Sequence, residues 1–249
     1  MNHIPLLVFD FDGVIVDGME EYWWSACHAA EALFPTLRQS PPKEVPHSFR
    51  QLRPWVHHGW EMVLLAAEHS HLEVSAWLAD YAGQQAKAMD RLGASPEMLQ
   101  QALDRVRNHA LNTARPQWLA LHRPFPGVGE RLQAFDSERV DWVVLTTKGA
   151  AFTAELLDGL GLQPWRLYGR EHGTKPEVLL RLQEERPLRA FIEDRRATLE
   201  TVRATPGLEQ LSCLLVRWGY LKPQDLTGLP DGMHFIDRKD LERPLAEWP

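Results

Sequence analysis

Leu6-Leu7-Val8-Phe9-Asp10-Phe11-Asp12-Gly13-Val14 is the stretch of this sequence that decides its fold. Its continuous apolar run predicts a strand buried on both faces, as in a parallel sheet that helices cover on each side. Ligands of such sheets bind beyond the carboxyl ends of the strands, which is where Asp10 and Asp12 lie. A polar loop after a strand is the alternative interpretation, because Asp and Gly are ordinary turn residues.

The spacing of the two aspartates indicates a chemistry. Residues two apart in an extended chain point the same way and lie ~6.6 Å apart, which suits one small anionic group and a divalent metal. One carboxylate could attack phosphorus and the other could move protons, while Mg²⁺ would reduce the repulsion between carboxylates and phosphate.

A second strand-like run ends in residues that can bind an anion. Val140–Leu145 is followed by Thr146-Thr147-Lys148-Gly149, and a helix is expected over residues 150–160. The start of a helix offers main-chain N–H groups to an anion, and the Thr146 hydroxyl would lie beside them. Thr is also a common N-cap residue, so a purely structural role is the alternative.

Two more segments place charged residues at the ends of strands. Lys175 precedes a helical pattern whose first turn suits Pro176, and its ammonium is a compact positive charge that can stabilise a phosphate. Leu188–Ile192 predicts a short strand that ends in Glu193-Asp194, and carboxylate oxygens are ligands that Mg²⁺ prefers.

Taken in order, these motifs resemble the four signatures of the haloacid dehalogenase (HAD) superfamily, and most closely its phosphoglycolate-phosphatase-like hydrolases. The resemblance covers about residues 3–17 and 124–220. It implies an α/β fold, a Rossmann-like doubly wound parallel sheet, with an inserted all-α cap. The segments Arg123–Val128 and Val216–Tyr220 also agree with the family pattern, without being catalytic by themselves.

The resemblance also implies roles for individual residues, as parts of a magnesium-dependent phosphatase that forms an aspartyl phosphate. The catalytic residues would be Asp10, Asp12, Thr146 and Lys175. Gly13, Thr147 and Lys148 would lie beside the substrate. The Mg²⁺ ligands would be Asp10, the main-chain carbonyl of Asp12, Asp194 and Glu193.

The fourth motif departs from the commonest family pattern. That pattern has Gly-Asp followed by another acid four residues on, whereas this chain has Glu193-Asp194 and Thr198 at the later position. Glu193 is therefore expected to replace the missing acid, either directly or through water.

Composition sets the class of protein. The chain has 249 residues, 44% of them hydrophobic, and a formal charge of −7. This size and hydrophobic content predict one large or two modest globular domains, and the negative charge without a basic block argues against a nucleic-acid partner. With no apolar stretch long enough to span a membrane and no leader-like N-terminus, we expect a cytoplasmic protein and no membrane partner. Cys27 and Cys213 predict no disulfide framework.

The pattern between the first two motifs is almost wholly helical. We expect a cap domain over residues 18–122 and a catalytic core over residues 1–17 and 123–249. A loop is expected around Gln39–Lys43. The expected cap helices are Glu20–Leu33, Pro54–His69, Leu72–Leu92 and a last one that starts at Ser95-Pro96 and runs to Leu121.

Two cap arginines are candidates for substrate selection. Arg50 and Arg53 could grip a second anionic group of the substrate in bidentate fashion. Solvated arginines near a helix start are the alternative. The expected partner is a small phosphorylated metabolite, and the oligomeric state is expected to be a monomer or a homodimer.

Several other functions are compatible with parts of the sequence. A dehalogenase of the superfamily would lack the second aspartate and the metal, so Asp12 and Asp194 argue against it. A phosphonate hydrolase would need an imine-forming cap lysine, for which Lys43 and Lys87 are the candidates. A phosphosugar mutase would use the same four loops, and a catalytically silent binding protein could have kept the fold.

Overall fold

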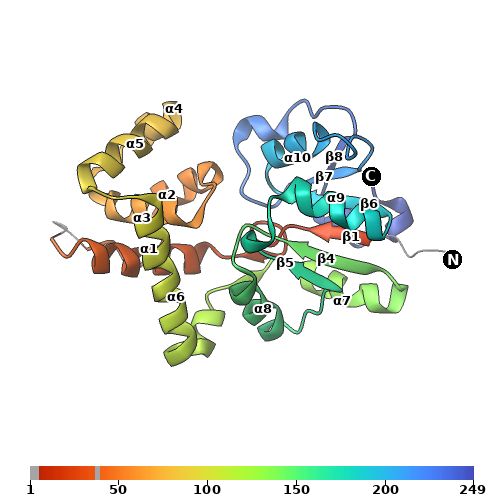
Figure 1. The fold of residues 1–249 in the computed structure, drawn as a ribbon, viewed down its shortest axis with the longest axis horizontal. Coiled ribbons are helices and arrows are strands. Elements are labelled where there is room, and N and C mark those ends of the chain that lie inside the picture. The colour runs from red at the N-terminus through yellow and green to blue at the C-terminus, as the bar shows by residue number, and fades with distance from the viewer. Residues whose placement is uncertain (1–5, 37–39) are drawn as a thin grey trace. The chain divides into compact units, whose positions relative to one another are not determined.

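The computed structural model describes residues 6–36 and 40–249. The chain divides into two compact units, one formed by the residues up to Asp17 together with Arg123–Pro249, the other by Gly18–His122. The first unit contains a sheet of six parallel strands in the order β5-β4-β1-β6-β7-β8 (Figure 1). The six strands are β1 (Leu6–Phe9), β4 (Asp141–Leu145), β5 (Arg166–Tyr168), β6 (Leu188–Glu193), β7 (Cys213–Val216) and β8 (Met233–Ile236).

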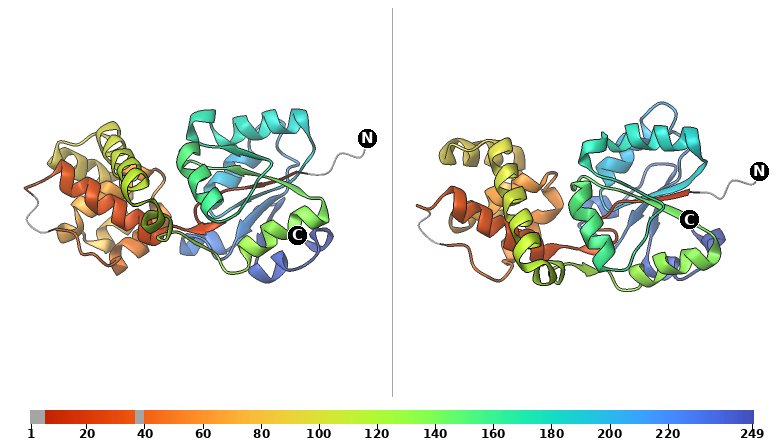
Figure 2. Two further views of the ribbon diagram at one scale, coloured as in Figure 1. Left: turned by 90° about the horizontal axis from the view of Figure 1, so that it is seen from below. Right: turned by 60° about the horizontal axis from the view of Figure 1, so that its bottom comes forward.

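Helices cover both faces of this sheet, as Figure 2 shows. The chain moves from β1 outward to β4 and β5, then returns across β1 to β6 and continues to β7 and β8. Because crossover connections are right-handed, this reversal places the helices of the two halves on opposite faces. The helices of this unit are α7 (Val128–Glu138), α8 (Ala150–Gly159), α9 (Lys175–Glu185), α10 (Arg196–Arg203), α11 (Arg238–Leu241) and the short 3₁₀ helices η3 (Arg170–His172), η4 (Pro223–Leu226) and η5 (Leu245–Glu247).

The alternation of β1 explains why its run is apolar throughout. Leu6 and Val8 belong to a cluster with side chains of α9 and α10. Phe9 points to the other face, where its ring centroid lies 6.3 Å from that of Phe135 on α7 and 6.2 Å from that of Trp142. A strand buried on both faces needs apolar residues at every position. The α/β class and the doubly wound parallel sheet are thereby confirmed.

A two-stranded antiparallel ladder stands where the chain leaves and re-enters the α/β unit. It pairs β2 (Val16–Asp17) with β3 (Arg123–Pro124), with Asp17 opposite Arg123. Both connections to the helical unit therefore start from one small ladder.

The second unit is helical in the residues that the structure describes. Helices α1, α3 and α6 pack against one another. Its elements are α1 (Met19–Leu33), α2 (His47–Leu52), η1 (Arg53–Trp55), α3 (Gly59–Ala67), η2 (His69–His71), α4 (Val74–Ala79), α5 (Tyr81–Leu92) and α6 (Pro96–Leu119). Within residues 6–36 and 40–249, no helix combines the length and the apolar character that a membrane crossing requires.

Two predicted helices of this unit were wrong in their continuity. Leu72–Leu92 is interrupted at Asp80, whose backbone leaves the helical region and whose carboxylate accepts a hydrogen bond from Gly83 N as the N-cap of α5. Pro54–His69 is interrupted before α3, where the Glu61 carboxylate accepts the main-chain N–H groups of His57 and His58. Local side-chain acceptors thus start new helices inside runs that periodicity joins.

The long helix α6 is bent near its end. Ala114 has φ −148° and ψ 41°, two residues before Pro116. Proline has no N–H to donate and its ring crowds the preceding turn, so the helix is broken there. Of the loop predicted at Gln39–Lys43, Gln39 lies outside the described residues, and residues 40–43 are outside regular helices and strands.

Candidate active site

The first aspartate stands at the point where the winding of the sheet reverses. Asp10 follows β1, which is flanked by β4 on one side and β6 on the other, and its main-chain N–H donates to Ile192 O at 2.8 Å. Crevices for ligands form at such a switch point, beyond the carboxyl ends of the strands. The sheet topology therefore places Asp10 where a small ligand is expected to bind.

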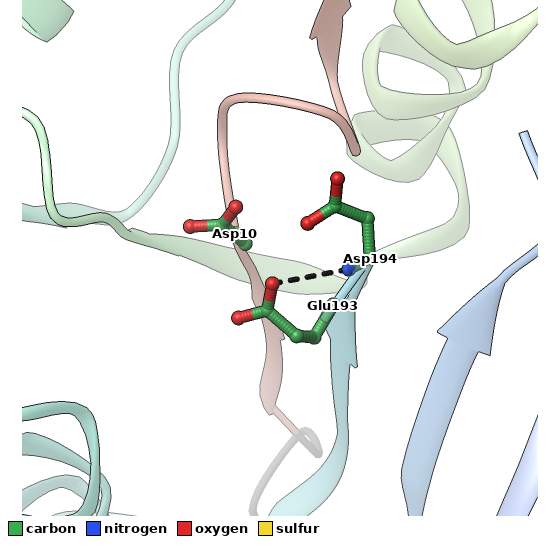
Figure 3. A group of neighbouring side chains, drawn as sticks. All are labelled: Asp10, Glu193 and Asp194. Carbon is green, nitrogen blue, oxygen red and sulfur yellow. Dashed lines mark hydrogen bonds between the residues drawn. The ribbon is translucent and has the colours of Figure 1, made fainter. Parts of the chain in front are cut away.

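Three acids converge at this point (Figure 3). Asp10, Glu193 and Asp194 each offer a carboxylate oxygen, and these oxygens lie within 4.8 Å of one another. The three residues are 6%, 2% and 5% exposed. Such close, buried carboxylates repel one another unless a cation or a proton lies among them.

Lys175, the first residue of α9, supplies one positive charge to this cluster. Its Nζ donates to Asp10 Oδ1 and to Glu193 Oε2, both at 2.6 Å. The other oxygen of Glu193 accepts the main-chain N–H groups of Asp194 and Arg195, both at 3.1 Å. Both carboxylate oxygens of Glu193 are thus held by hydrogen bonds, and Glu193 keeps the Lys175 ammonium beside Asp10.

The pKa values of these groups follow from burial and charge. Burial, together with the charge of Glu193, raises the pKa of Asp10 to about 7, although Lys175 opposes the shift. Burial also raises the pKa of Glu193. Burial alone would lower the pKa of Lys175, but the carboxylates of Asp10 and Glu193 raise it. Lys175 is therefore charged at neutral pH, and its single charge is shared between Asp10 and Glu193.

The donor set fits a hard divalent cation. The three acids offer only oxygen atoms, and burial together with the charge of Glu193 raises the pKa of Asp10, so that a bound cation would relieve the repulsion among the carboxylates. Mg²⁺ prefers oxygen ligands and commonly takes only one or two carboxylates together with water and phosphate oxygens. Asp10 and Asp194, with Glu193 beside them, can hold such an ion.

Asp12 lies on the same loop and faces a second lysine. Lys148 Nζ is 3.5 Å from Asp12 Oδ1, and Lys148 is buried. Thr146 is also buried, and its Oγ1 accepts the main-chain N–H of Lys148 at 3.1 Å, whereas Thr147 is exposed. The loop after β4 thus brings Lys148 toward the aspartate loop.

Gly13 is required by the geometry of that loop. Its φ is +91°, and a Cβ built at Gly13 would lie 2.0 Å from Asp194 Oδ2. A side chain would be strained and would overlap the carboxylate. Gly13 therefore allows the loops after β1 and β6 to approach each other.

Arg50 and Arg53 belong to the helical unit, and each has a partner there. Arg50 forms an exposed ion pair with Glu20, with Nη2 3.2 Å from Oε1. Arg53 is buried, and its guanidinium carbon lies 4.8 Å from the centroid of the Tyr22 ring. These contacts favour packing for Arg53 and leave Arg50 accessible.

Sequence reasoning missed a contribution from the loop after β7. Tyr220 N donates to Asp194 Oδ2 at 2.8 Å, and Tyr220 Oη donates to Asp17 Oδ1 at 2.6 Å. Because β7 is the neighbour of β6 in the sheet, its carboxyl end lies beside Asp194. The position of Val216–Tyr220 after a predicted strand was the available signal, but the order of the strands was needed to use it.

Comparisons with known proteins agree on the fold. No family model matches the chain, and no curated protein matches it. Solved structures do. A predicted phosphoglycolate phosphatase from Haemophilus somnus is 17% identical with a TM-score of 0.60, over 97% of this chain and 98% of that one. A haloacid dehalogenase-like hydrolase from Streptococcus pneumoniae is 15% identical with a TM-score of 0.59, over 97% and 98%.

A third solved structure comes from a differently named enzyme class. A candidate β-phosphoglucomutase from Thermotoga maritima is 15% identical with a TM-score of 0.58, over 96% of each chain. At these identities the likeness concerns the fold. The chain thus has the fold of solved structures that include a haloacid dehalogenase-like hydrolase, which is the fold that the sequence resemblance implied.

Proposed function

We propose that this protein is a magnesium-dependent phosphatase that hydrolyses a small phosphomonoester through an aspartyl-phosphate intermediate. The observation that supports this most is the position of Asp10, which lies at the switch point of the sheet, 2.6 Å from Lys175 and among two further buried acids. Burial raises the pKa of Asp10 to about 7, and carboxylates with shifted pKa values are frequent at catalytic sites, which supports this function over a binding protein without catalysis.

In the proposed mechanism Asp10 is the nucleophile. A carboxylate oxygen of Asp10 attacks phosphorus, and the bond between phosphorus and the ester oxygen breaks. Asp12 gives its proton to the departing alkoxide. It then takes a proton from the water that attacks phosphorus, which releases inorganic phosphate and restores Asp10.

Positive and polar groups would stabilise the charge on the phosphoryl oxygens. Lys175 lies beside the nucleophile and Lys148 beside Asp12, while Thr146 and the main chain at Gly13 would complete the phosphate site. When bound by Asp10, the Asp12 carbonyl, Asp194 and Glu193, directly or through water, Mg²⁺ would supply Lewis-acid polarisation and charge neutralisation. Lys175 cannot do this alone, because its single positive charge is shared between Asp10 and Glu193.

We further propose that the helical unit, Gly18–His122, acts as a cap that selects the substrate. Arg50 or Arg53 would bind a second anionic group of the substrate, as a bidentate partner for a carboxylate. Arg50→Met would then raise KM for an anionic substrate with little change in kcat. An unchanged KM in both Arg50→Met and Arg53→Met variants would exclude both arginines.

The rival functions differ in their products. A phosphosugar mutase would return a phosphorylated isomer in place of inorganic phosphate. A phosphonate hydrolase would form an imine that borohydride traps, but Lys43 and Lys87 are both exposed, whereas imine-forming lysines are commonly desolvated. The cytoplasmic location and the state as monomer or homodimer stay predictions.

The test is phosphate release from a panel of small phosphomonoesters, including 2-phosphoglycolate and sugar phosphates, with Mg²⁺ and with EDTA. We expect release that requires Mg²⁺ and is absent from Asp10→Asn, a variant that keeps the shape of the side chain. Product analysis by ³¹P NMR distinguishes a mutase. Undiminished release by Asp10→Asn would refute the assignment of the nucleophile.

A further inference from the structure

The loop that follows β7 contacts the aspartate loop, residues 10–14, at two places. Trp218 Nε1 donates to Val14 O at 2.9 Å, which fixes one loop on the other. A Cβ built at Gly219 would lie 2.3 Å from Asp194 Cβ and 2.5 Å from Gly13 O. The main chain at Gly219 therefore approaches both the metal-binding acid and the aspartate loop more closely than any other residue type would allow.

Asp194 is held in one position by these neighbours. Its Oδ2 accepts the main-chain N–H of Tyr220 at 2.8 Å, and Gly13 and Gly219 lie close to its side chain. Loss of a partner that fixes a metal ligand in this way commonly lowers metal affinity about 10- to 100-fold. The main chain at Tyr220 therefore orients the carboxylate of Asp194.

The side chain of Tyr220 extends this contact to the ladder between the two units. Its hydroxyl donates to Asp17 Oδ1 at 2.6 Å. Asp17 is the last residue of β2 and pairs with Arg123 of β3. It therefore lies where both connections to the helical unit begin. One residue thus links the acid cluster with the point where the chain leaves the α/β unit.

We infer that Tyr220 is a positioning residue that couples metal binding at Asp194 to the order of the β2–β3 ladder. This inference rests on the proposed metal site. Repulsion among the carboxylates of Asp10, Glu193 and Asp194 weakens this arrangement, and a divalent cation among them would stabilise it. A more firmly held Asp194 carboxylate would fix the main chain at Tyr220 through the hydrogen bond from Tyr220 N. The Tyr220 hydroxyl would in turn fix Asp17. Because coupling between two sites is reciprocal, loss of the hydroxyl should also weaken metal binding.

The test measures metal binding and ladder order without any substrate. Isothermal titration with Mg²⁺ alone gives the affinity, and hydrogen exchange of peptides covering residues 14–19 and 121–126 gives the order of the ladder with and without Mg²⁺. In the unmodified protein, Mg²⁺ should slow exchange in both peptides. In Tyr220→Phe this slowing should be lost, and the Mg²⁺ affinity should fall about threefold to tenfold, which corresponds to the loss of one typical intramolecular hydrogen bond.

Three variants separate the coupling from a general loss of structure. Asp17→Ala removes the acceptor and should reproduce Tyr220→Phe, while the double variant should add nothing further. Asp17→Asn keeps an acceptor and should restore most of the coupling. Tyr168→Phe is the matched control, because the Tyr168 hydroxyl also makes a hydrogen bond, with Arg166, but at the edge strand β5.

The outcomes distinguish this inference from the proposed function. If the unmodified protein binds Mg²⁺ and releases phosphate, but Tyr220→Phe and Asp17→Ala keep its Mg²⁺ affinity and ladder protection, the coupling is refuted while the phosphatase stands. If the unmodified protein binds no Mg²⁺, both the coupling through Tyr220 and the magnesium-dependent phosphatase are refuted. Should Tyr220→Phe fail to fold, the comparison of Asp17→Ala with Asp17→Asn decides alone.

Discussion

Lys175 Nζ lies 2.6 Å from Asp10 Oδ1, and this contact joins the start of α9 to the end of β1 across 165 positions of sequence. The ammonium also binds Glu193 at 2.6 Å. A buried lysine between two carboxylates stays charged, and a nucleophile beside a fixed positive charge needs no further rearrangement when an anionic substrate arrives. The pair is therefore the electrostatic centre of the proposed phosphatase.

Replacement of Lys175 by Met should lower kcat/KM by about 10²–10³-fold, the cost of removing one preorganised donor from a site where charge develops. Lys239→Met makes the same change at an exposed lysine on α11 and should leave kcat/KM unchanged. Steady-state kinetics with the preferred ester measures both. Equal kcat/KM values in the two variants would contradict a role for Lys175 in the chemistry.

The raised pKa of Asp10 predicts how the stability of the protein depends on pH in EDTA. The carboxyl of an unfolded Asp titrates near 4, whereas burial raises the pKa of Asp10 to about 7. Between about pH 4 and about pH 7 the folded chain therefore binds more protons than the unfolded chain, so the contribution of Asp10 to the free energy of unfolding falls as pH rises.

Urea unfolding at a series of pH values measures this slope. Asp10→Asn should reduce the fall, although Glu193, whose pKa burial also raises, contributes a slope of the same sign. Saturating Mg²⁺ should flatten the profile, because the cation replaces the proton among the carboxylates. A steeper fall in Asp10→Asn than in the unmodified protein would show that the sign is wrong.

A buried ion pair in the helical unit predicts a large effect on stability. Arg107 Nε and Nη2 donate to the two oxygens of Glu21, each at 2.8 Å, and His122 Nε2 lies 3.6 Å from Glu21 Oε2. Arg107→Met leaves the Glu21 charge buried without its main partner and should cost about 3–5 kcal/mol of unfolding free energy. Chemical denaturation measures this cost.

An exposed pair in the same unit is the control. Arg50→Met removes the partner of Glu20 at the surface and should cost less than about 1 kcal/mol. The double variant Glu21→Met and Arg107→Met should recover much of the loss, since no buried charge remains unpaired. If Arg107→Met lowers the unfolding free energy as little as Arg50→Met does, the ion pair between Glu21 and Arg107 is not buried in solution.

Local patterns were sufficient to predict the strands before the first, second and fourth motifs, because each is a short apolar run ending in polar residues, whereas Lys175 of the third motif was predicted from the helix start that follows it. The resemblance to the HAD superfamily implied that Asp10, Lys175 and Glu193 act at one site, and in the structure Lys175 forms hydrogen bonds with both acids. No local sequence pattern predicts the order of the strands in the sheet. For that reason the contact of Tyr220 with Asp194 and Asp17 could not be predicted, although the segment itself was noted.

The helical unit was predicted less well for a different reason. Hydrophobic periodicity continues through Asp80 and through the residues before α3, so it joined helices that side-chain acceptors separate. A capping carboxylate changes the backbone at one or two residues, which is too short a signal to interrupt a periodic pattern. The starts of helices α3 and α5 therefore depend on hydrogen bonds to single carboxylates.

Gly13 permits a matched test of the approach between the aspartate loop and Asp194. Gly13 and Gly127 both have positive φ, +91° and +81°, so an alanine strains the backbone at either position. Only at Gly13 would the new Cβ overlap another group, at 2.0 Å from Asp194 Oδ2, whereas the built Cβ of Gly127 has no neighbour within 4 Å.

Gly13→Ala should therefore displace Asp194 and lower the Mg²⁺ affinity by about 10–100-fold, as for the loss of a residue that orients a ligand. Gly127→Ala should lose stability from strain, of order 1 kcal/mol, while its Mg²⁺ affinity stays unchanged. Titration calorimetry with Mg²⁺ on both variants, after circular dichroism has shown each to be folded, separates overlap from strain. If both variants bind Mg²⁺ equally well, the carboxylate of Asp194 is not confined by Gly13, and its place among the metal ligands must be reassigned.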